Sequence, residues 1–378
     1  MSKLLVVWRG PVKRASGLGI ASREYVAALR RQGITVKVGR GFNKPRRRRR
    51  LHSRKVLIYH QLPRKWTLAK DRKRYDRIIL NTVWETTRVP RRWVPKINKF
   101  DSVCVPTEFN RIALRQSGVS IPIYRVPHGV HRTKFKPGNP KYPLARAKGR
   151  FVFLSVFGFQ HRKNPEALLR AYWEQFSASD KVLLIIKTNG YSPRESGRWI
   201  RNRIASYKKR LGIRKQTAPI FVIAKRLNSV QLAGLYALAN AFVLPTRGEG
   251  VGLPFMEALS SGIPVIATGW GGQMDFLNGG NSFLVRYKLK NPRTGMNSRH
   301  AIARRFRSLF SGREQLWAEA DLASLKSQLL HAYRHPELCV KKGRQGRRDM
   351  ERYSWDRAGA MMKRVIEQRR ARRISDRF

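Results

Sequence analysis

The stretch AFVLPTRGEGVGLPFMEALSSGIPVIA, residues 241–267, decides the fold of this chain. Its apolar run at residues 241–244 predicts a buried strand. Glycines crowd the loop that follows, Pro254 suits the first turn of a helix, and Gly262 is a good left-handed end for that helix. A second apolar run, residues 265–267, predicts another buried strand. We therefore expect a strand, a glycine-rich loop, a helix and a strand.

Two acidic residues lie in this stretch: Glu249 is in the glycine-rich loop, and Glu257 is in the predicted helix. Glycines let backbone N–H groups approach a ligand, and the start of a helix favours an anion. The pattern predicts a pocket that holds a phosphate on amides while carboxylates accept hydrogen bonds from hydroxyl groups. A nucleotide sugar presents this combination, because its diphosphate lies between two polyols.

The segment EGVGLPFMEALSSGIPVI, residues 249–266, closely resembles the hallmark of the retaining glycosyltransferases of family 4. That hallmark is a Glu, seven residues and a second Glu within a sequence like EGFGLPxxEAxAxGxPVI. An ordinary loop, helix and strand with a solvated Glu is the alternative. The resemblance implies an α/β protein of the GT-B class, with two Rossmann-like domains whose parallel sheets face each other across a cleft.

The composition fits a globular protein with two domains, since the chain has 378 residues and a hydrophobic content of 42%. Its two cysteines, Cys104 and Cys339, lie far apart, so we expect no disulfide framework and a reducing, cytoplasmic location, with a place at the periphery of a membrane or nucleic acid as the alternative. No histidine spacing and no DxD motif signals a metal, so we expect neither a metal nor a cofactor. We also expect no signal peptide and no transmembrane segment.

The charge balance is strongly basic, because 81 Lys and Arg against 22 Asp and Glu give a net charge of +59. Residues 1–150 hold 39 basic and 6 acidic residues, a net +33, whereas the rest hold 42 and 16, a net +26. Charge of this size bears on partners rather than on fold. We expect an acidic partner, either a nucleic acid or an anionic membrane or polymer. A general basic bias in composition is the alternative.

Residues 1–145 are expected to form the first domain. A strand at residues 4–8, a helix at 20–32 and a strand at 34–38 would open its doubly wound sheet. Residues 134–149, rich in Lys, Pro and Gly, are expected to link this domain to the next one.

Two glycines, Gly17 and Gly19, follow the first predicted strand. A dinucleotide site is not favoured, because Ser22 replaces the third glycine and Gly39 and Arg40 stand where a ribose-binding acid should follow the second strand. The resemblance to family 4 implies instead that Gly17 and Gly19 face the donor phosphates.

Five consecutive arginines occupy residues 46–50. They are either a solvated loop or a phosphate-binding patch.

His60 and Glu85 lie just beyond the carboxyl ends of two predicted strands, the edge at which open α/β sheets bind ligands. The resemblance implies that an acid or histidine near Glu85 faces the acceptor. Glu85 is therefore a candidate catalytic base, and His60 is a weaker acceptor-side candidate. The alternative is a structural Glu85 paired with Arg88 or Arg92.

His128 belongs to a turn that resembles the P-[NH]-G-V-D turn of the family, with His131 at the Asp position. We interpret His128 as mainly structural, and contact with the acceptor is the alternative.

Residues 150–350 are expected to form the second domain, which would bind the nucleotide sugar. Arg162 and Lys163 follow its first predicted strand, and the resemblance implies that they contact the donor diphosphate. There they would stabilise the charge that grows on the leaving phosphate. Phe157 and Gly158 fill the region in which some relatives carry a further arginine.

The remaining donor contacts are implied by the resemblance alone. Glu257 would bind the ribose hydroxyls, and Glu249 would hold the sugar. Together with Glu85, Lys163 and Glu249 are the candidate catalytic residues. The backbone amides expected to help Glu249 are those of Gly250, Val251, Gly252 and Leu253.

Three further segments complete the chain. Ser229 is expected to cap a helix, whereas residues 288–315 show no clear periodicity and are expected to be an insertion or a mobile loop. Ser354 is expected to cap a last helix. By resemblance, that helix in residues 354–378 would return to the first domain.

The sequence thus predicts a metal-independent hexosyltransferase that moves a sugar, with retention, from a donor such as a UDP- or GDP-sugar. The dense positive charge of residues 1–150 favours a polyanionic acceptor: a modified nucleic acid, such as DNA with a hydroxyl-bearing base, an envelope polymer or a glycolipid. The alternative is a non-catalytic nucleic-acid-binding protein on a GT-B scaffold. The oligomeric state is not predicted.

Overall fold

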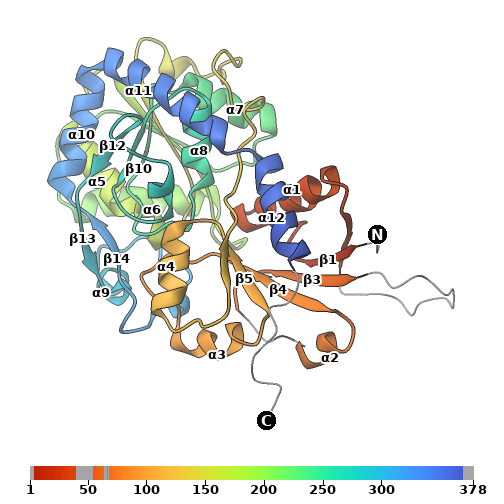
Figure 1. Ribbon diagram of the computed structural model, residues 1–378. Coiled ribbons are helices and arrows are strands. Elements are labelled where there is room, and N and C mark those ends of the chain that lie inside the picture. Colours follow the sequence, from red (N-terminus) through yellow and green to blue (C-terminus); the bar gives the residue numbers. More distant parts are fainter. Residues whose placement is uncertain (1–3, 40–53, 64–65, 67, 369–378) are drawn as a thin grey trace. The chain divides into compact units, whose positions relative to one another are not determined.

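The computed structural model of the protein describes residues 4–39, 54–63, 66 and 68–368 (Figure 1). The chain divides into two compact units. Unit 1 comprises Met1–Trp84, Arg91–Gly129 and Tyr353–Phe378, and unit 2 comprises Glu85–Pro90 and Val130–Arg352. The arginine run at residues 46–50 lies outside the described residues, so both interpretations of it stay open.

A parallel sheet forms the centre of unit 1. Its described strands are β1 (Leu5–Arg9), β2 (Thr35–Val38), β3 (Lys55–His60), β4 (Arg77–Asn81), β5 (Ser102–Val105) and β6 (Ile123–Arg125). They follow the order β2-β1-β3-β4-β5-β6, with Val6 opposite both Val36 and Val56. Val6, Val56 and Ile78 are fully buried, as expected for strands of a parallel sheet that is covered on both faces.

Helices pack around the sheet of unit 1. They include α1 (Gly17–Arg31), α2 (Leu68–Arg72), α3 (Val94–Ile97), α4 (Glu108–Gln116) and α12 (Trp355–Glu367). The side chain of Ser16 accepts a hydrogen bond from the Gly19 amide, so α1 begins three residues before the predicted helix. Helix α12 begins at the predicted cap Ser354 and lies beside α1 (Figure 1). The two helices approach closely because Gly359 faces Ala28.

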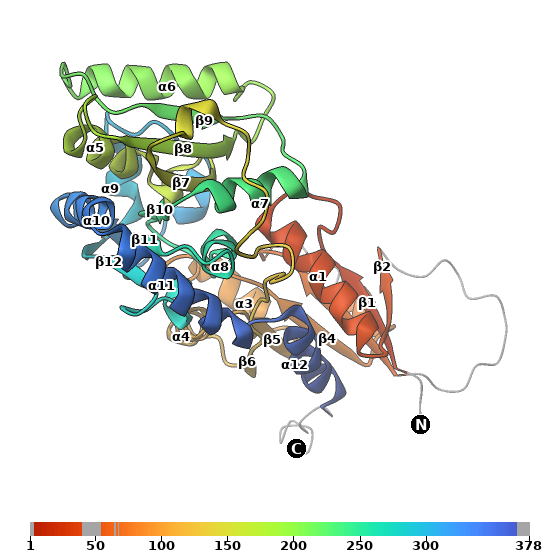
Figure 2. The ribbon, with the colours of Figure 1, turned by 90° about the horizontal axis from the view of Figure 1, so that it is seen from above.

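A second parallel sheet forms the centre of unit 2 (Figure 2). Its described strands are β7 (Phe151–Gly158), β8 (Val182–Asn189), β9 (Ile220–Ile223), β10 (Ala241–Leu244), β11 (Val265–Thr268) and β12 (Ser282–Val285). They follow the order β12-β11-β10-β7-β8-β9, and Phe153 lies opposite both Ala241 and Leu184. The chain runs outward from the β7–β10 pair in both directions, so the topological switch point lies between these strands. Ligands of open α/β sheets bind beyond the carboxyl ends of the strands at such a point.

The helices of unit 2 include one that the sequence patterns did not indicate. Helix α11 (Pro336–Asp349) follows α10 (Leu322–Arg334) directly, and both lie next to β12 (Figure 2). Gly346 lets α11 approach α8 (Leu253–Ser260), because a Cβ added at Gly346 would lie 2.5 Å from the side chain of Leu259. A Cβ added at Gly343 would lie 1.9 Å from the carbonyl oxygen of Gly262, just after α8. Asn228, and not Ser229, caps α7 (Ser229–Leu238), and its capping box is completed by Gln231. The helices are α5 (Pro165–Gln175), α6 (Gly197–Arg210), α7 (Ser229–Leu238), α8 (Leu253–Ser260), α9 (Pro292–Asn297), α10 (Leu322–Arg334) and α11 (Pro336–Asp349).

Residues 288–315 are folded and partly buried, so the expectation of a mobile loop is wrong. Strand β13 (Tyr287–Lys290) pairs antiparallel with β14 (Trp317–Ala320), and α9 follows β13. Met296, Ile302 and Phe310 are buried. Periodicity gave no signal here because the elements are short and each buries isolated apolar residues.

The division into units differs from the expected boundary at residue 145. Residues 134–149 pack onto unit 2, since the hydroxyl of Ser260 donates to the carbonyl of Phe135 and the Tyr142 amide donates to Gly234. Segment Glu85–Pro90 also joins unit 2 rather than unit 1. Such contacts depend on tertiary structure, so local composition does not predict them. Among the described residues, no helix combines the length and apolar character needed to cross a bilayer.

Candidate functional site

The loop between β10 and α8 is buried and closely packed. Gly248 lies against the main chain of Glu85: a Cβ added there would stand 2.1 Å from the Glu85 carbonyl oxygen. Gly252 adopts a left-handed backbone with φ of 90° at the start of α8, a conformation that favours glycine. The strand, loop, helix and strand predicted for residues 241–267 are confirmed, and the predicted amide donors, residues 250–253, lead into the first turn of α8.

The loop after β7 brings two cations to the same place. A single 3₁₀ turn, His161–Lys163, follows β7, and Asn164 then adopts a left-handed backbone with φ of 55°. The side chain of Asn164 caps α5 by accepting from the Ala167 amide. The loop is tied to the neighbouring one, because the Arg162 carbonyl accepts hydrogen bonds from the Arg247 amide and the Thr246 hydroxyl.

Four charged side chains meet between these loops. Lys163 forms an ion pair with Glu249, and the guanidinium of Arg162 lies 3.2 Å from the other carboxylate oxygen of Glu249. Arg162 also donates to the Gly248 carbonyl and lies 3.5 Å from the carboxylate of Glu85. The side chains of Lys163 and Glu249 are only 10% and 6% exposed. We call Glu85, Arg162, Lys163 and Glu249 the four-charge cluster; its formal charges sum to zero.

Burial and pairing set the protonation of the four-charge cluster. Burial alone would raise the pKa of Glu249, but Lys163 and Arg162 outweigh it and lower that pKa. Burial lowers the pKa of Lys163, against the opposing effect of Glu249. Burial raises the pKa of Glu85, which Arg162 opposes and Glu249 reinforces. The two carboxylates therefore differ: Glu249 is held ionised, and Glu85 takes up a proton more readily.

A second group of charged residues, Arg247, Glu166 and Glu319, lies next to the four-charge cluster. The sequence patterns did not indicate this group. Arg247 contacts the carboxylates of Glu319 at 2.6 Å and Glu166 at 3.1 Å, and it donates to the His161 carbonyl at 2.5 Å. Burial would raise the pKa of Glu166, but Arg247 lowers it to about 2. Arg247 thus fixes the turn that carries Arg162. The position of Arg247 directly before Gly248 is the sequence feature that could have indicated its role. Glu319 contacts Arg247 from strand β14, which the sequence did not predict.

Glu257 lies apart from the four-charge cluster, one turn into α8. Its carboxylate accepts a hydrogen bond of 2.7 Å from the hydroxyl of Tyr236. Burial raises the pKa of Glu257 to about 7, although the hydrogen bond from Tyr236 opposes this shift. The side chain can therefore accept or donate a hydrogen bond near neutral pH.

The candidate glycines Gly17 and Gly19 lie at the start of α1 in unit 1. Gly17 is exposed, and Gly19 is buried with no room for a Cβ, which would lie 2.1 Å from the Arg14 carbonyl oxygen. Their contact with donor phosphates stays a prediction.

His60 and His128, both in unit 1, are buried in an aromatic cluster. The hydroxyl of Ser22 lies 2.8 Å from His60 Nδ1 and accepts from the indole N–H of Trp8. The ring of Tyr25 packs against both His60 and His128. Burial lowers the pKa of each histidine to about 3, so both are neutral near pH 7. A structural role accounts for these contacts, and contact with an acceptor stays a prediction.

Comparison with known proteins finds a family model and curated relatives that each match part of the chain. Residues 148–294 match the family model of the Glycosyl transferases group 1. A D-inositol 3-phosphate glycosyltransferase of Corynebacterium jeikeium is 30% identical over 166 residues, which cover 42% of this chain and 38% of that protein. An alpha-monoglucosyldiacylglycerol synthase of Streptococcus pneumoniae is 26% identical over 181 residues, 46% of this chain and 38% of that protein. The chain thus matches less than two fifths of the length of these curated relatives.

Solved structures match nearly the whole chain. A sucrose-phosphate synthase of Thermosynechococcus elongatus superposes with a TM-score of 0.68 at 16% identity, covering 96% of this chain and 98% of that one. The Anabaena protein HepE, crystallised with UDP and glucose, superposes with a TM-score of 0.64 at 11% identity, covering 98% and 100%. At such identities the likeness shows the fold, and the fold is GT-B, as the sequence predicted.

Proposed function

We propose that the protein is a glycosyltransferase, class EC 2.4, that uses a nucleotide sugar and retains the anomeric configuration; the match of residues 148–294 to the family model of the Glycosyl transferases group 1 supports this proposal. The observation that carries the proposal is the meeting of Arg162, Lys163 and Glu249 beyond the carboxyl ends of β7 and β10. Two buried cations at a topological switch point suit a diphosphate.

Each group of unit 2 has a place in this proposal. Arg162 and Lys163 bind the diphosphate of a UDP- or GDP-sugar and stabilise its charge as the glycosidic bond to phosphate breaks. Glu249 and the amides of residues 250–253 hold the sugar, and Glu257 binds the ribose hydroxyls. The two cations do the work that a bound metal would otherwise do, so we propose transfer without a metal.

The contact of Glu85 with Arg162 favours a role for Glu85 in the donor-binding site over the expected role as a base that deprotonates the acceptor. Its carboxylate lies beside Arg162, which is one of the two proposed diphosphate ligands. An acceptor hydroxyl would still need to lose a proton. On the same face of the sugar, an oxygen of the departing phosphate is a base already in place.

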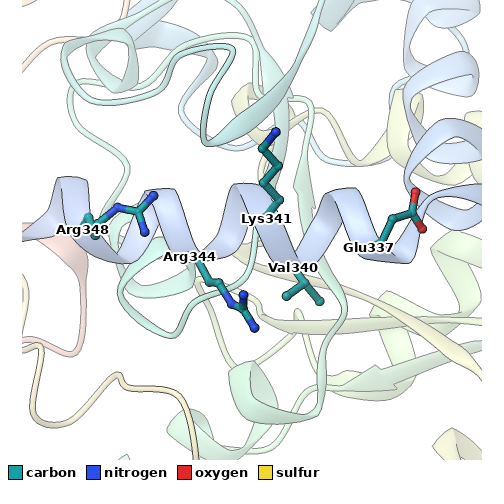
Figure 3. A pocket seen from close by; sticks show the side chains of 5 residues that line it. All are labelled: Glu337, Val340, Lys341, Arg344 and Arg348. Atoms are coloured by element: carbon teal, nitrogen blue, oxygen red, sulfur yellow. The ribbon is translucent and has the colours of Figure 1, made fainter.

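We propose an acceptor that bears phosphate or another acidic group. Residues 1–150 carry the denser positive charge, and one relative is a D-inositol 3-phosphate glycosyltransferase. Unit 2 adds a pocket on the outer face of α11, where Val340 is 52% exposed (Figure 3). Its lining residues are Glu337, Val340, Lys341, Arg344 and Arg348. Three cations there suit an anionic surface or polymer.

A thermal-shift screen of nucleoside diphosphates and nucleotide sugars tests the donor proposal. A ligand that binds only the folded protein stabilises it by RT ln(1 + [L]/Kd), so a true donor raises the melting temperature in a concentration-dependent way. Glu257→Ala should reduce the shift that the nucleoside part produces. If the whole panel leaves the melting temperature unchanged, the proposal fails.

A protein that binds nucleic acid without catalysis is the second candidate, supported by the net charge of +59. Binding of this kind weakens steeply as salt rises. Turnover of a nucleotide sugar separates the two candidates, because a binding protein would have none.

A further inference from the structure

The four-charge cluster is electrically balanced before any donor arrives. Glu249 lies against Lys163 and Arg162, and Glu85 provides the second negative charge beside Arg162. A diphosphate brings at least two more negative charges to the same cations. The site would then hold an excess of negative charge in a setting where like charges are costly, because exposure to water is small.

Segment Glu85–Pro90 holds Glu85 firmly in the cluster. The Thr87 amide donates to the carbonyl of Leu316 at 3.0 Å, and the Leu316 amide donates to the Thr87 hydroxyl at 3.0 Å. The hydroxyl of Thr86 donates to the Arg88 carbonyl at 2.8 Å. Together with the contact of Gly248 on the main chain of Glu85, these bonds fix the backbone from which the carboxylate contacts Arg162.

The groups that face Glu85 come from three elements of unit 2. Arg162 and Lys163 lie in the turn after β7, and Glu249 lies in the loop after β10. The phenol of Tyr191, in the loop after β8, also interacts with Glu85 and Arg162. Burial raises the pKa of Tyr191 to about 12, so this group stays neutral. Of these groups, Glu85 is the carboxylate with the weaker cationic support, since Arg162 lies farther from it than from Glu249.

We propose that Glu85 is a proton-linked counter-ion of the donor site, which balances Arg162 when the site is empty and takes up one proton from solvent when a nucleoside diphosphate binds. The inference rests on the proposed function, because it takes the four-charge cluster as the diphosphate site. The carboxylate gains one proton on binding and returns it to solvent when the nucleotide leaves. No bond of the donor is made or broken in this step.

Linkage fixes the sign of the effect. If the bound state holds one more proton than the free state, a lower pH strengthens binding and a higher pH weakens it, by up to about tenfold per pH unit. Glu85→Gln removes the titrating group and one negative charge. It should therefore lose the part of the pH dependence that Glu85 contributes and bind a nucleoside diphosphate more tightly than wild type at high pH.

Titration calorimetry of the full chain with UDP and GDP tests this inference. At about pH 8 the terminal phosphate is fully ionised, since its last pKa lies near 6. The observed enthalpy, measured in buffers of different ionisation enthalpy, gives the number of protons taken up. We expect up to one proton per site in wild type and none in Glu85→Gln.

Glu174→Gln is the matched control, because Glu174 is paired with Arg170 and Lys326 near the surface of unit 2. It should keep the proton uptake of wild type. Binding without proton uptake in wild type, or unchanged uptake in Glu85→Gln, would overturn the inference while leaving the proposed function intact. If neither nucleotide binds wild type at any pH, the proposed function fails and the inference fails with it. If a variant does not fold, the number of protons taken up by wild type still tests the inference.

Discussion

Lys163 donates a hydrogen bond from Nζ to the carboxylate of Glu249, although 86 positions separate the two residues in the chain. They meet because β7 and β10 are neighbours in the sheet of unit 2 and the loop after each strand carries one of them. Arg162, beside Lys163, completes the contact. This relationship links the fold to the proposed chemistry, since it places two cations where a donor diphosphate would bind.

Lys163→Ala should lower the turnover of a nucleotide sugar by about 100-fold or more, because a preorganised cation at the leaving phosphate is lost. The value of kcat for transfer or for donor hydrolysis measures this. Lys181→Ala is the matched control, because Lys181 is exposed in the same unit. An unchanged kcat in Lys163→Ala would show that this side chain does not act on the phosphate.

Arg247→Met should destabilise unit 2 by about 3–5 kcal/mol, because the carboxylates of Glu166 and Glu319 lose their shared cation. Denaturant unfolding measures the change. Arg170→Met, which removes an exposed pair with Glu174, should cost about 0–1 kcal/mol. Equal stabilities for the two variants would contradict the supporting role of Arg247.

Gly248→Ala should disrupt the site, because its new methyl group would lie 2.1 Å from the Glu85 carbonyl oxygen. We expect weaker binding of nucleoside diphosphates, together with a lower melting temperature. Gly279→Ala is the control, since a Cβ at Gly279 would meet nothing within 4 Å. Wild-type affinity in Gly248→Ala would mean that the contact between Gly248 and Glu85 is not needed.

Acid should destabilise unit 1. The pKa of His60 and of His128 is about 3 in the folded protein, against roughly 6.5 when unfolded. Between these values the unfolded chain binds more protons, so stability falls as pH falls, by up to about 1.4 kcal/mol per pH unit for each histidine.

Hydrogen-exchange protection of the β3 amides, compared at about pH 7 and pH 5, measures this loss of stability. Substitution of the exposed His335 by Gln should leave the pH dependence as it is. Equal protection at both pH values would contradict the neutral, buried state of the two histidines.

Chelation should leave transfer intact, because Arg162 and Lys163 supply the positive charge at the diphosphate. Turnover in excess EDTA, compared with turnover in Mg²⁺ or Mn²⁺, measures this. Loss of activity in EDTA that is restored by added metal would show that the two cations are not sufficient.

The sequence was most informative where local signals agreed. In residues 241–267, apolar runs, glycines and Pro254 all indicate the same strand, loop, helix and strand, and the structure has them as β10, α8 and β11. The resemblance to family 4 assigned Arg162, Lys163 and Glu249 to one donor, and the structure places these side chains in contact.

The sequence was silent where the site depends on distant packing. Glu85 lies 3.5 Å from Arg162, and the nearby Thr87 bonds to Leu316 of unit 2; no local pattern predicts either contact. Arg247 contacts Glu319, which lies in β14. This strand pairs with β13, and both strands are too short to show a clear sequence pattern. Glu85 is a member of the four-charge cluster, and Arg247 bonds to the turn that carries Arg162, yet neither belongs to the glutamate motif.

The most direct test of the central claim is the release of nucleoside diphosphate from a panel of UDP- and GDP-sugars, measured for wild type and for Glu249→Gln. We predict that wild type turns over at least one donor and that Glu249→Gln, folded as judged by its melting curve, turns it over about 100-fold more slowly or worse. Turnover of no donor by wild type, or equal turnover by both proteins, would contradict the claim that this buried cluster is the catalytic donor site.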